Sequence, residues 1–294
     1  MALLEIIIYN ITTGLKMIKL LATDLDGTLF YPKRRTRGIS SKNKKFLKKF
    51  VQRGNTVVVV SGRNYEFCKK ISKKVNAPIS MIGCNGSVIY KDNEFFSDDP
   101  MDHEEIKKFY TKNKFSDNVV AWVFMSDRYP LILVPVRLSY LTQIVVKFYL
   151  HMQGFYKDRF VFGEKHLFKM LNDSDARIYK MMAMYGVGKK KIEIARLEKE
   201  KFFDAYSTKF EILWSRESIE FMKKGVNKAN ALKNFINVLQ IKEDDVAVVG
   251  DSGNDVPLFE TFKNSFVMQH APEEVKSKAK TQIEGVYCIQ EFIN

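Results

Sequence analysis

The chain has 294 residues, of which 46% are hydrophobic and 28% are charged, a composition typical of a globular protein with a core large enough for about two domains. Its three cysteines form no CxxC pair, which argues against a disulfide framework or a zinc site and favours a reducing compartment, the cytoplasm. No apolar run approaches the ~18 residues that a membrane helix needs. The net charge of +14 suits anionic partners, but charge alone does not separate phosphorylated metabolites or nucleic acid from lysines spread over solvated helix faces.

The first sixteen residues differ from the rest of the chain. They are apolar but few, and no basic residue precedes their apolar part, so they make a poor signal peptide. Met17 then opens the segment "MIKLLATDLDG", which is typical of the start of a strand. We therefore expect Met17 to be the natural start and residues 1–16 to be an upstream extension. An additional N-terminal strand is the alternative.

Buried strands alternate with helices in the first ninety residues. The strands are expected at 18–26, 56–63 and 78–86, and the helices at 42–54 and 64–76. Ser40 or Ser41 can cap the first helix, and Gly54 ends it. This alternating order predicts a parallel sheet with helices outside it.

The middle of the chain mixes hairpins and helices, which predicts a separate α+β domain with an antiparallel sheet. Strands are expected within 118–136 (two, around a turn), at 175–186, 209–215 and 218–225, and helices at 141–152 and 189–203. The end returns to α/β, with a helix at 225–240, a strand and loop at 244–255, a helix from 255, a strand at 264–271 and a helix at 272–280. The pattern therefore predicts a parallel-sheet domain of residues 17–87 and 222–294, interrupted by an insertion of residues 88–221.

Polar residues follow three of the predicted parallel strands. They are "DLDG" at 24–27, Ser61, and "GDSGND" at 250–255. Ligands of open parallel sheets bind at the carboxyl ends of the strands. A carboxylate at the end of a buried strand costs stability unless its charge is coordinated. Hard oxygen ligands without nearby histidine or cysteine suit magnesium.

Jointly these motifs resemble those of the haloacid dehalogenase (HAD) superfamily. "DLDGTLF" is similar to the DxDGT motif, "VVVVSGR" to the strand that ends in Ser or Thr, Lys228 in "KKGVNKANAL" to the motif lysine, and "GDSGNDVPLF" to the GDxxND motif. The long insertion and the step "GCNGSVIY" resemble the Cof-type subfamily with a type 2 cap. One departure is His270, where the family usually has Asn. The resemblance implies an α/β fold: a three-layer, Rossmann-like parallel-sheet core with an inserted α+β cap domain.

The resemblance also implies a role for each motif residue. Asp24 would attack phosphorus and form an aspartyl-phosphate, and Asp26 would protonate the leaving alcohol and then activate water. Lys228 would offset the negative charge. Magnesium would be held by Asp24, the Asp26 backbone carbonyl and Asp251, and the phosphate by Ser61, Gly27, Gly62 and Asn254, with Asp255 and Thr28 in support.

Structural alternatives accompany several of these roles. Ser61 could cap a helix, and Asp255 could be a helix N-terminal charge. Lys223 and Lys224 lie close to Lys228 in sequence and compete for its role.

The function implied is a magnesium-dependent phosphatase of small phosphorylated metabolites, with sugar phosphates as the expected class and no nucleic-acid or membrane partner. An aspartate at position 26 resembles phosphatases and phosphomutases, so a sugar phosphomutase is the alternative, and a non-catalytic nucleic-acid-binding or regulatory protein is a third interpretation. The basic run between Lys33 and Arg37 could attract an anionic substrate, although a solvated loop is the plainer interpretation. The sequence does not indicate the oligomeric state.

Overall fold

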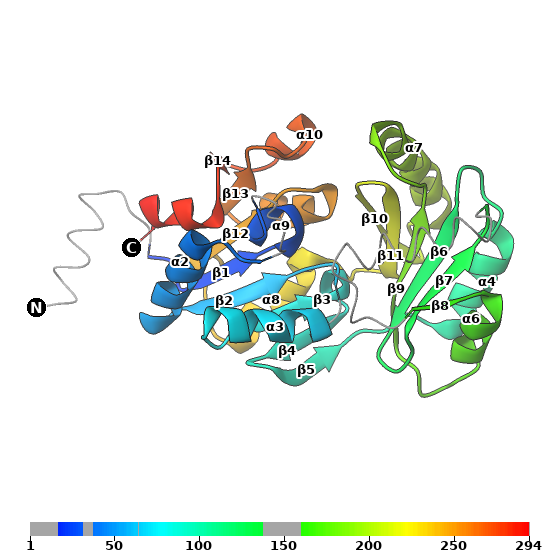
Figure 1. Cartoon of the computed structure of the whole chain (residues 1–294), viewed down its shortest axis with the longest axis horizontal. Helices are drawn as coiled ribbons and strands as arrows, with labels where there is room; N and C mark the ends of the chain where they lie inside the picture. The colour runs from blue at the N-terminus through cyan, green and yellow to red at the C-terminus, as the bar shows by residue number, and fades with distance from the viewer. Residues whose placement is uncertain (1–16, 32–37, 64, 138–159, 294) are drawn as a thin grey trace, which may run out of the picture. The chain divides into compact units, whose positions relative to one another are not determined.

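The computed structural model describes residues 17–31, 38–63, 65–137 and 160–293. These residues form two compact units, one up to Ser97 and again from Lys228, the other Asp98–Asn227 (Figure 1). The expected extension at 1–16, the basic run at 33–37 and the expected helix at 141–152 lie outside the described residues.

The first unit, called the core unit here, contains an eight-stranded sheet in the order β14-β13-β12-β1-β2-β3-β4-β5. The strands are β1 (Leu20–Thr23), β2 (Thr56–Val60), β3 (Ser80–Gly83), β4 (Val88–Lys91), β5 (Glu94–Asp98), β12 (Val246–Gly250), β13 (Asn264–Met268) and β14 (Thr281–Ile283). From β14 to β3 neighbouring strands pair parallel, and β4 pairs antiparallel with β3. The predicted parallel sheet is therefore confirmed.

Helices cover both faces of this sheet. They are α2 (Ser41–Gln52), α3 (Tyr65–Val75), α8 (Lys228–Val238), α9 (Val256–Thr261) and α10 (Glu273–Lys276). Side chains alternate along β1, so Leu21 packs in the cluster that contains residues of α2 and α3, and Leu20 packs in the cluster that contains residues of α8 and α9. Two apolar clusters on opposite faces explain the near-continuous apolar runs of these strands and confirm the predicted three-layer architecture.

Local sequence sets the start of α2 and its buried face. The Ser40 side chain accepts a hydrogen bond from the Asn43 backbone N–H at 3.1 Å, which confirms one of the two predicted caps. Phe46, Leu47 and Phe50 lie on one face and are buried.

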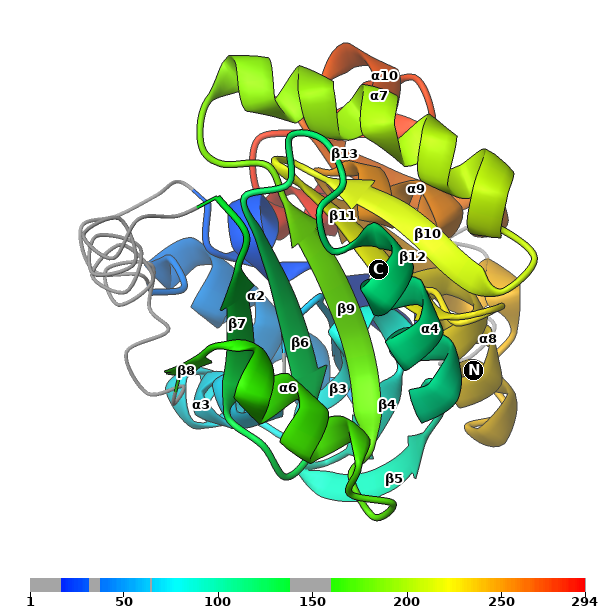
Figure 2. The same ribbon diagram turned by 90° about the vertical axis from the view of Figure 1, so that its right-hand side faces the viewer.

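The second unit, called the inserted unit here, has a six-stranded sheet in the order β10-β11-β9-β6-β7-β8. The strands are β6 (Ala121–Ser126), β7 (Leu131–Pro135), β8 (Phe160–Phe162), β9 (Ile178–Met184), β10 (Phe210–Ser215) and β11 (Ser218–Lys223), and the helices are α4 (His103–Asn113), α6 (Glu164–Leu171) and α7 (Lys189–Tyr206). Trp122 and Phe124 of β6 pack in one cluster with residues of α4, α6 and α7, whereas Ala121 and Val123 face the other way. Figure 2 shows α4 and α6 in front of the first face.

The division between the units differs from the predicted domain boundaries at residues 88 and 222. It falls at Asp98 and Lys228 instead. The strands β4 and β5 extend the core sheet beyond β3, and β11 completes the sheet of the inserted unit by pairing with β9 and β10. Sheet pairing therefore decides both boundaries, and sequence patterns did not reveal it.

Other differences are local. The helix predicted at 225–240 begins only at Lys228, and the strand predicted at 78–86 ends at Gly83 because Cys84 and Asn85 both have positive φ, +49° and +60°. The helices α4 and α6 were not predicted. In the described part of the chain, no helix is long and apolar enough to cross a membrane.

Candidate active site

Three neighbouring strands of the core unit end at one edge of its sheet with polar residues. β1 lies between β12 and β2, and all three run parallel. Asp24 follows β1 and Asp251 follows β12, and the Asp24 N–H donates to the Val249 carbonyl at 2.9 Å. Ser61 follows β2, and its N–H donates to the Ile82 carbonyl at 2.9 Å. The polar residues therefore lie together at the carboxyl ends of the strands, as predicted.

The turn after β1 brings Thr28 onto Asp251. Gly27 has φ +88°, and a Cβ at this position would clash with the Asp251 carboxylate, so the glycine is required both for its conformation and for its lack of a side chain. The Thr28 hydroxyl donates to Asp251 Oδ1 at 3.0 Å. The predicted supporting role of Thr28 thus has a definite partner, the Asp251 carboxylate.

Lys228 is a fully buried cation that contacts Asp24. Its side chain is 0% exposed, and its Nζ lies 2.8 Å from Asp24 Oδ1 and 2.7 Å from Asp255 Oδ1. Lys223 and Lys224, the competing lysines, pair instead with Asp99 and Glu211 of the inserted unit. Of the three, Lys228 is the one that contacts Asp24.

Burial changes the acid–base behaviour of this pair. Desolvation raises the pKa of Asp24 well above its ordinary value, although the ammonium of Lys228 opposes this shift. Burial by itself lowers the pKa of Lys228, but Asp24 and Asp255 together raise it above its ordinary value. Lys228 is therefore a fixed positive charge beside the carboxylate that is the candidate nucleophile.

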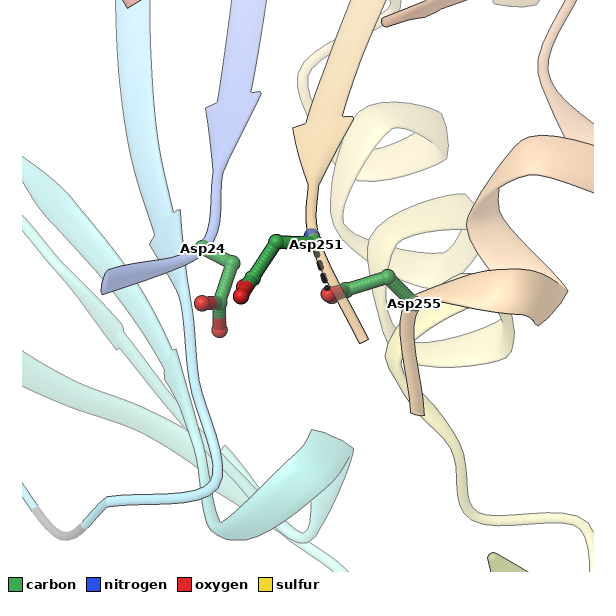
Figure 3. A group of neighbouring side chains, drawn as sticks. All are labelled: Asp24, Asp251 and Asp255. Atoms are coloured by element: carbon green, nitrogen blue, oxygen red, sulfur yellow. Dashed lines mark hydrogen bonds between the residues drawn. The ribbon is translucent and has the colours of Figure 1, made fainter. Parts of the chain in front are cut away.

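Three carboxylates, those of Asp24, Asp251 and Asp255, each offer an oxygen within 4.8 Å of the other two. Figure 3 shows the carboxylates of Asp24 and Asp251 pointing toward one another, each from the end of its strand. Desolvation by burial also raises the pKa of Asp251. Closely spaced, buried carboxylate oxygens fit a hard divalent cation such as magnesium, because its charge would offset their repulsion.

Asp255 has less freedom to bind a cation than the other two carboxylates. Its Oδ1 accepts from Lys228, and its Oδ2 accepts from the backbone N–H groups of Asp251 at 3.0 Å and Ser252 at 3.1 Å (Figure 3). A Cβ at Gly250 would clash with the Asp255 carboxylate, so this glycine makes room for it. These contacts suit the supporting role predicted for Asp255, and they leave Asp24 and Asp251 as the side chains best placed to hold a cation.

The residues predicted to bind phosphate lie around this group. Ser61 is 2% exposed, and its hydroxyl accepts from the Arg63 N–H at 3.3 Å, with Gly62 between them. Asn254 is buried, and its Oδ1 accepts from Lys228 at 3.3 Å and from the Ser252 hydroxyl at 2.7 Å. Both side chains are fixed by neighbours at the edge of the sheet where Asp24 lies.

The structure thus brings together three groups at one edge of a parallel sheet. They are the acidic turn after β1, the buried Lys228 and the acidic end of β12. The sequence profile described as haloacid dehalogenase-like hydrolase matches residues 21–286. The chain belongs to this family. The resemblance inferred from the motifs is confirmed, and the protein is a HAD-type hydrolase by family.

Proteins similar to this chain match it over nearly its whole length. The chain is 24% identical over 275 residues to the 5-amino-6-(5-phospho-D-ribitylamino)uracil phosphatase of Bacillus subtilis, and the match covers 89% of this chain and 91% of that phosphatase. A haloacid dehalogenase-like hydrolase from B. subtilis has a similar structure, with a TM-score of 0.75 at 20% identity, over 94% of this chain and all of the other. A HAD subclass IIB sugar phosphatase matches with a TM-score of 0.71 at 18% identity, over 93% and 98% of the two chains. At these identities the two structural matches establish the fold.

Arg63 is a site residue that sequence analysis missed. Its guanidinium forms a bidentate ion pair with the Asp26 carboxylate: Nε pairs with Oδ2, and Nη2 lies 2.6 Å from Oδ1. The Arg63 side chain is almost fully buried, whereas that of Asp26 is 49% exposed. The arginine that ends "VVVVSGR" was the available signal, but nothing in its spacing from Asp26 points to the pair.

Asn85 is a second residue at the site for which the sequence predicts no role. It follows β3, and its Oδ1 accepts from Asn254 Nδ2 at 3.3 Å. The left-handed conformation of Asn85 is one that asparagine tolerates better than most residues. The "GCNG" step thus reaches the site through Asn254.

Proposed function

We propose that this protein is a magnesium-dependent phosphatase that hydrolyses small phosphorylated metabolites, with sugar phosphates as the expected substrate class. The observation that carries the proposal is the position of Asp24: its carboxylate contacts a buried lysine on one side and faces a second strand-end carboxylate, Asp251, on the other. A carboxylate attacks an anionic phosphoryl group only if the repulsion between them is offset. Relatives named as phosphatases support the same reaction class.

Asp24 is the nucleophile in this mechanism. One of its oxygens attacks phosphorus, the bond from phosphorus to the ester oxygen breaks, and an aspartyl-phosphate forms. Lys228 offsets the charge of Asp24 and of the incoming phosphoryl group. Ser61, Asn254 and the backbone N–H groups of Gly27 and Gly62 are the proposed phosphate contacts.

Asp26 moves the protons. It gives a proton to the departing alkoxide and then takes one from the water that attacks the aspartyl-phosphate, so that inorganic phosphate leaves and Asp24 is restored. Magnesium, held by Asp24, Asp251 and the Asp26 backbone carbonyl, would supply Lewis-acid stabilisation of the phosphoryl oxygens. In the structure the Asp26 carboxylate is paired with Arg63 in its charged form, so Asp26 leaves this ion pair and takes up a proton before it acts as an acid.

The experiment that tests the proposal measures inorganic phosphate released from p-nitrophenyl phosphate and from a panel of sugar phosphates, in magnesium and in chelator. Release in magnesium that is lost in chelator and regained on adding the metal is the expected result. Absence of release across the panel would overturn the phosphatase. Conversion of a sugar phosphate to its positional isomer would identify a phosphomutase, and salt-dependent gel shifts without turnover would identify a nucleic-acid-binding protein.

A further inference from the structure

His270 lies at the end of the strand next to the one that carries Asp251. β13 pairs parallel with β12, and Gly250 lies opposite Val267 in the register. Two backbone hydrogen bonds fix the turn that holds the histidine: the Gln269 N–H donates to Ile283, and the Ala271 N–H donates to Met268, each at 3.0 Å. The same rule that gathers the candidate site at the carboxyl ends of the strands therefore brings His270 to its edge.

The Asp251 carboxylate has a partner on each of its oxygens. The Thr28 hydroxyl donates to Oδ1 at 3.0 Å, and His270 Nε2 lies 3.5 Å from Oδ2. The carboxylate is 15% exposed and the imidazole 33% exposed, so water competes little for these contacts at Asp251. The two partners come from segments far apart in sequence and meet on one side chain.

Tyr31 holds the imidazole in place. Its ring stacks on that of His270, with ring centroids 4.1 Å apart and an interplanar angle of 21°. Tyr31 belongs to the turn that carries Thr28, and its N–H donates to the Thr28 carbonyl at 3.2 Å. One turn thus carries both Thr28, which contacts Asp251 directly, and Tyr31, which stacks on the other partner of Asp251, His270.

We propose that His270 is a positioning residue of the metal site, which keeps the Asp251 carboxylate oriented toward Asp24. A ring nitrogen that donates its N–H to a carboxylate has no lone pair left for a cation, so Nε2 of His270 acts on a cation only through Asp251. This inference rests on the proposed metal site, and it gives a role to the residue at which the chain departs from the family pattern. Removing such a partner of a metal ligand lowers metal affinity by about 10- to 100-fold.

Two substitutions separate the contacts that His270 makes. His270→Phe keeps an aromatic ring that can stack on Tyr31 but removes the N–H, whereas His270→Gln removes the ring and keeps an N–H donor. His166→Phe is the matched control, because His166 is an exposed histidine of the inserted unit. Asp251→Asn provides the reference for loss of a proposed ligand.

The test is Mn²⁺ binding to the full chain without substrate, followed by the electron paramagnetic resonance of free Mn²⁺, with unfolding in chelator as the check on folding. We expect His270→Phe to weaken Mn²⁺ binding by about tenfold or more, with His270→Gln and His166→Phe close to wild type. Wild-type affinity in folded His270→Phe, beside a large loss in Asp251→Asn, would overturn the role of His270 alone. Wild-type affinity in Asp251→Asn, or no binding by the wild type, would overturn the metal site itself.

Discussion

The sheets of the two units differ in how their faces are covered and in the side chains that pack on them. The core sheet is covered on both faces, and its central strands, such as β2 and β12, consist of small, mostly β-branched residues. In the described part of the inserted unit, the helices α4, α6 and α7 pack against one face, whose core is aromatic: the ring of Phe109 contacts those of five other residues, Trp122, Phe202, Tyr206, Phe210 and Phe221.

The second face of the inserted sheet carries a buried ion pair. Lys180 of β9 and Glu220 of β11 are 2% and 6% exposed, and Nζ lies 3.0 Å from Oε1. They share that face with apolar residues, Ala121, Val123 and Leu133. Among the described residues, the buried charges Asp24, Asp255 and Lys228 of the core unit lie beyond the ends of its strands, whereas Lys180 and Glu220 of the inserted unit lie along theirs. Buried charge is therefore expected to be catalytic in the core unit and structural in the inserted one, and four predictions separate these roles.

The largest effect is expected at the candidate nucleophile. Asp24→Asn should lower kcat/KM for p-nitrophenyl phosphate by about 10⁴-fold or more, because the amide oxygen is a poor nucleophile, while the fold is kept. Activity and the denaturant midpoint are measured together. Asp244→Asn is the control, since Asp244 is an exposed aspartate of the same unit. Near wild-type turnover by Asp24→Asn would refute the nucleophile.

The buried pair of the inserted unit should matter for stability instead. Lys180→Met leaves the Glu220 carboxylate buried without its ammonium partner, so the free energy of unfolding should fall by about 3–5 kcal/mol. The double variant with Glu220→Leu should recover most of that loss, because it removes both charges. Denaturant unfolding of the single and double variants measures this. A single variant as stable as the wild type would show that the pair contributes little.

Asp26 should show its role through the leaving group. Asp26→Asn is expected to lower kcat/KM by about 10²-fold or more for an alkyl phosphate, which needs a proton on the departing oxygen. For p-nitrophenyl phosphate the loss in kcat/KM should be much smaller, because its leaving group departs as a stable anion. Equal losses for both substrates would contradict proton donation by Asp26.

Magnesium should stabilise the protein in a pH-dependent way. At a concentration 100 times its Kd it should add about 2.7 kcal/mol to the free energy of unfolding. The pKa values of Asp24 and Asp251 are raised by burial, so protons compete for these ligands from a pH above the ordinary carboxylate range. The magnesium effect should therefore shrink as pH is lowered.

In chelator the stability of the protein itself should change with pH in the opposite direction, and fall as pH is raised. A carboxyl whose pKa is raised on folding contributes stability below its unfolded pKa and loses it as pH rises through the folded value. Asp251→Asn should remove this contribution along with the response to magnesium. Unfolding midpoints from a pH near the ordinary aspartate pKa of about 4 up to a pH of about 8, with magnesium or chelator, measure both trends. A magnesium effect that stays constant over this range would contradict protonation of the ligands.

Much of the core unit was predictable because its signals are local. The β-branched run at β2, the cap at Ser40 and the glycine at position 27 each carry their structural meaning within a few residues. The inserted unit was predicted less completely. Its helices α4 and α6 were missed, and the compact units divide at Asp98 and Lys228 and not at the predicted residues 88 and 222, because strand pairing joins segments that are distant in sequence.

The sequence by itself determined the kinds of group in the candidate site and the strands that carry them, because a parallel sheet with apolar strands brings the polar residues at its carboxyl ends together. Only the tertiary structure decided which partners those groups have. Arg63 on Asp26, His270 beside Asp251 and Lys180 on Glu220 all join residues at least 19 positions apart. Such contacts depend on strand order and side-chain direction, which no short stretch of sequence records.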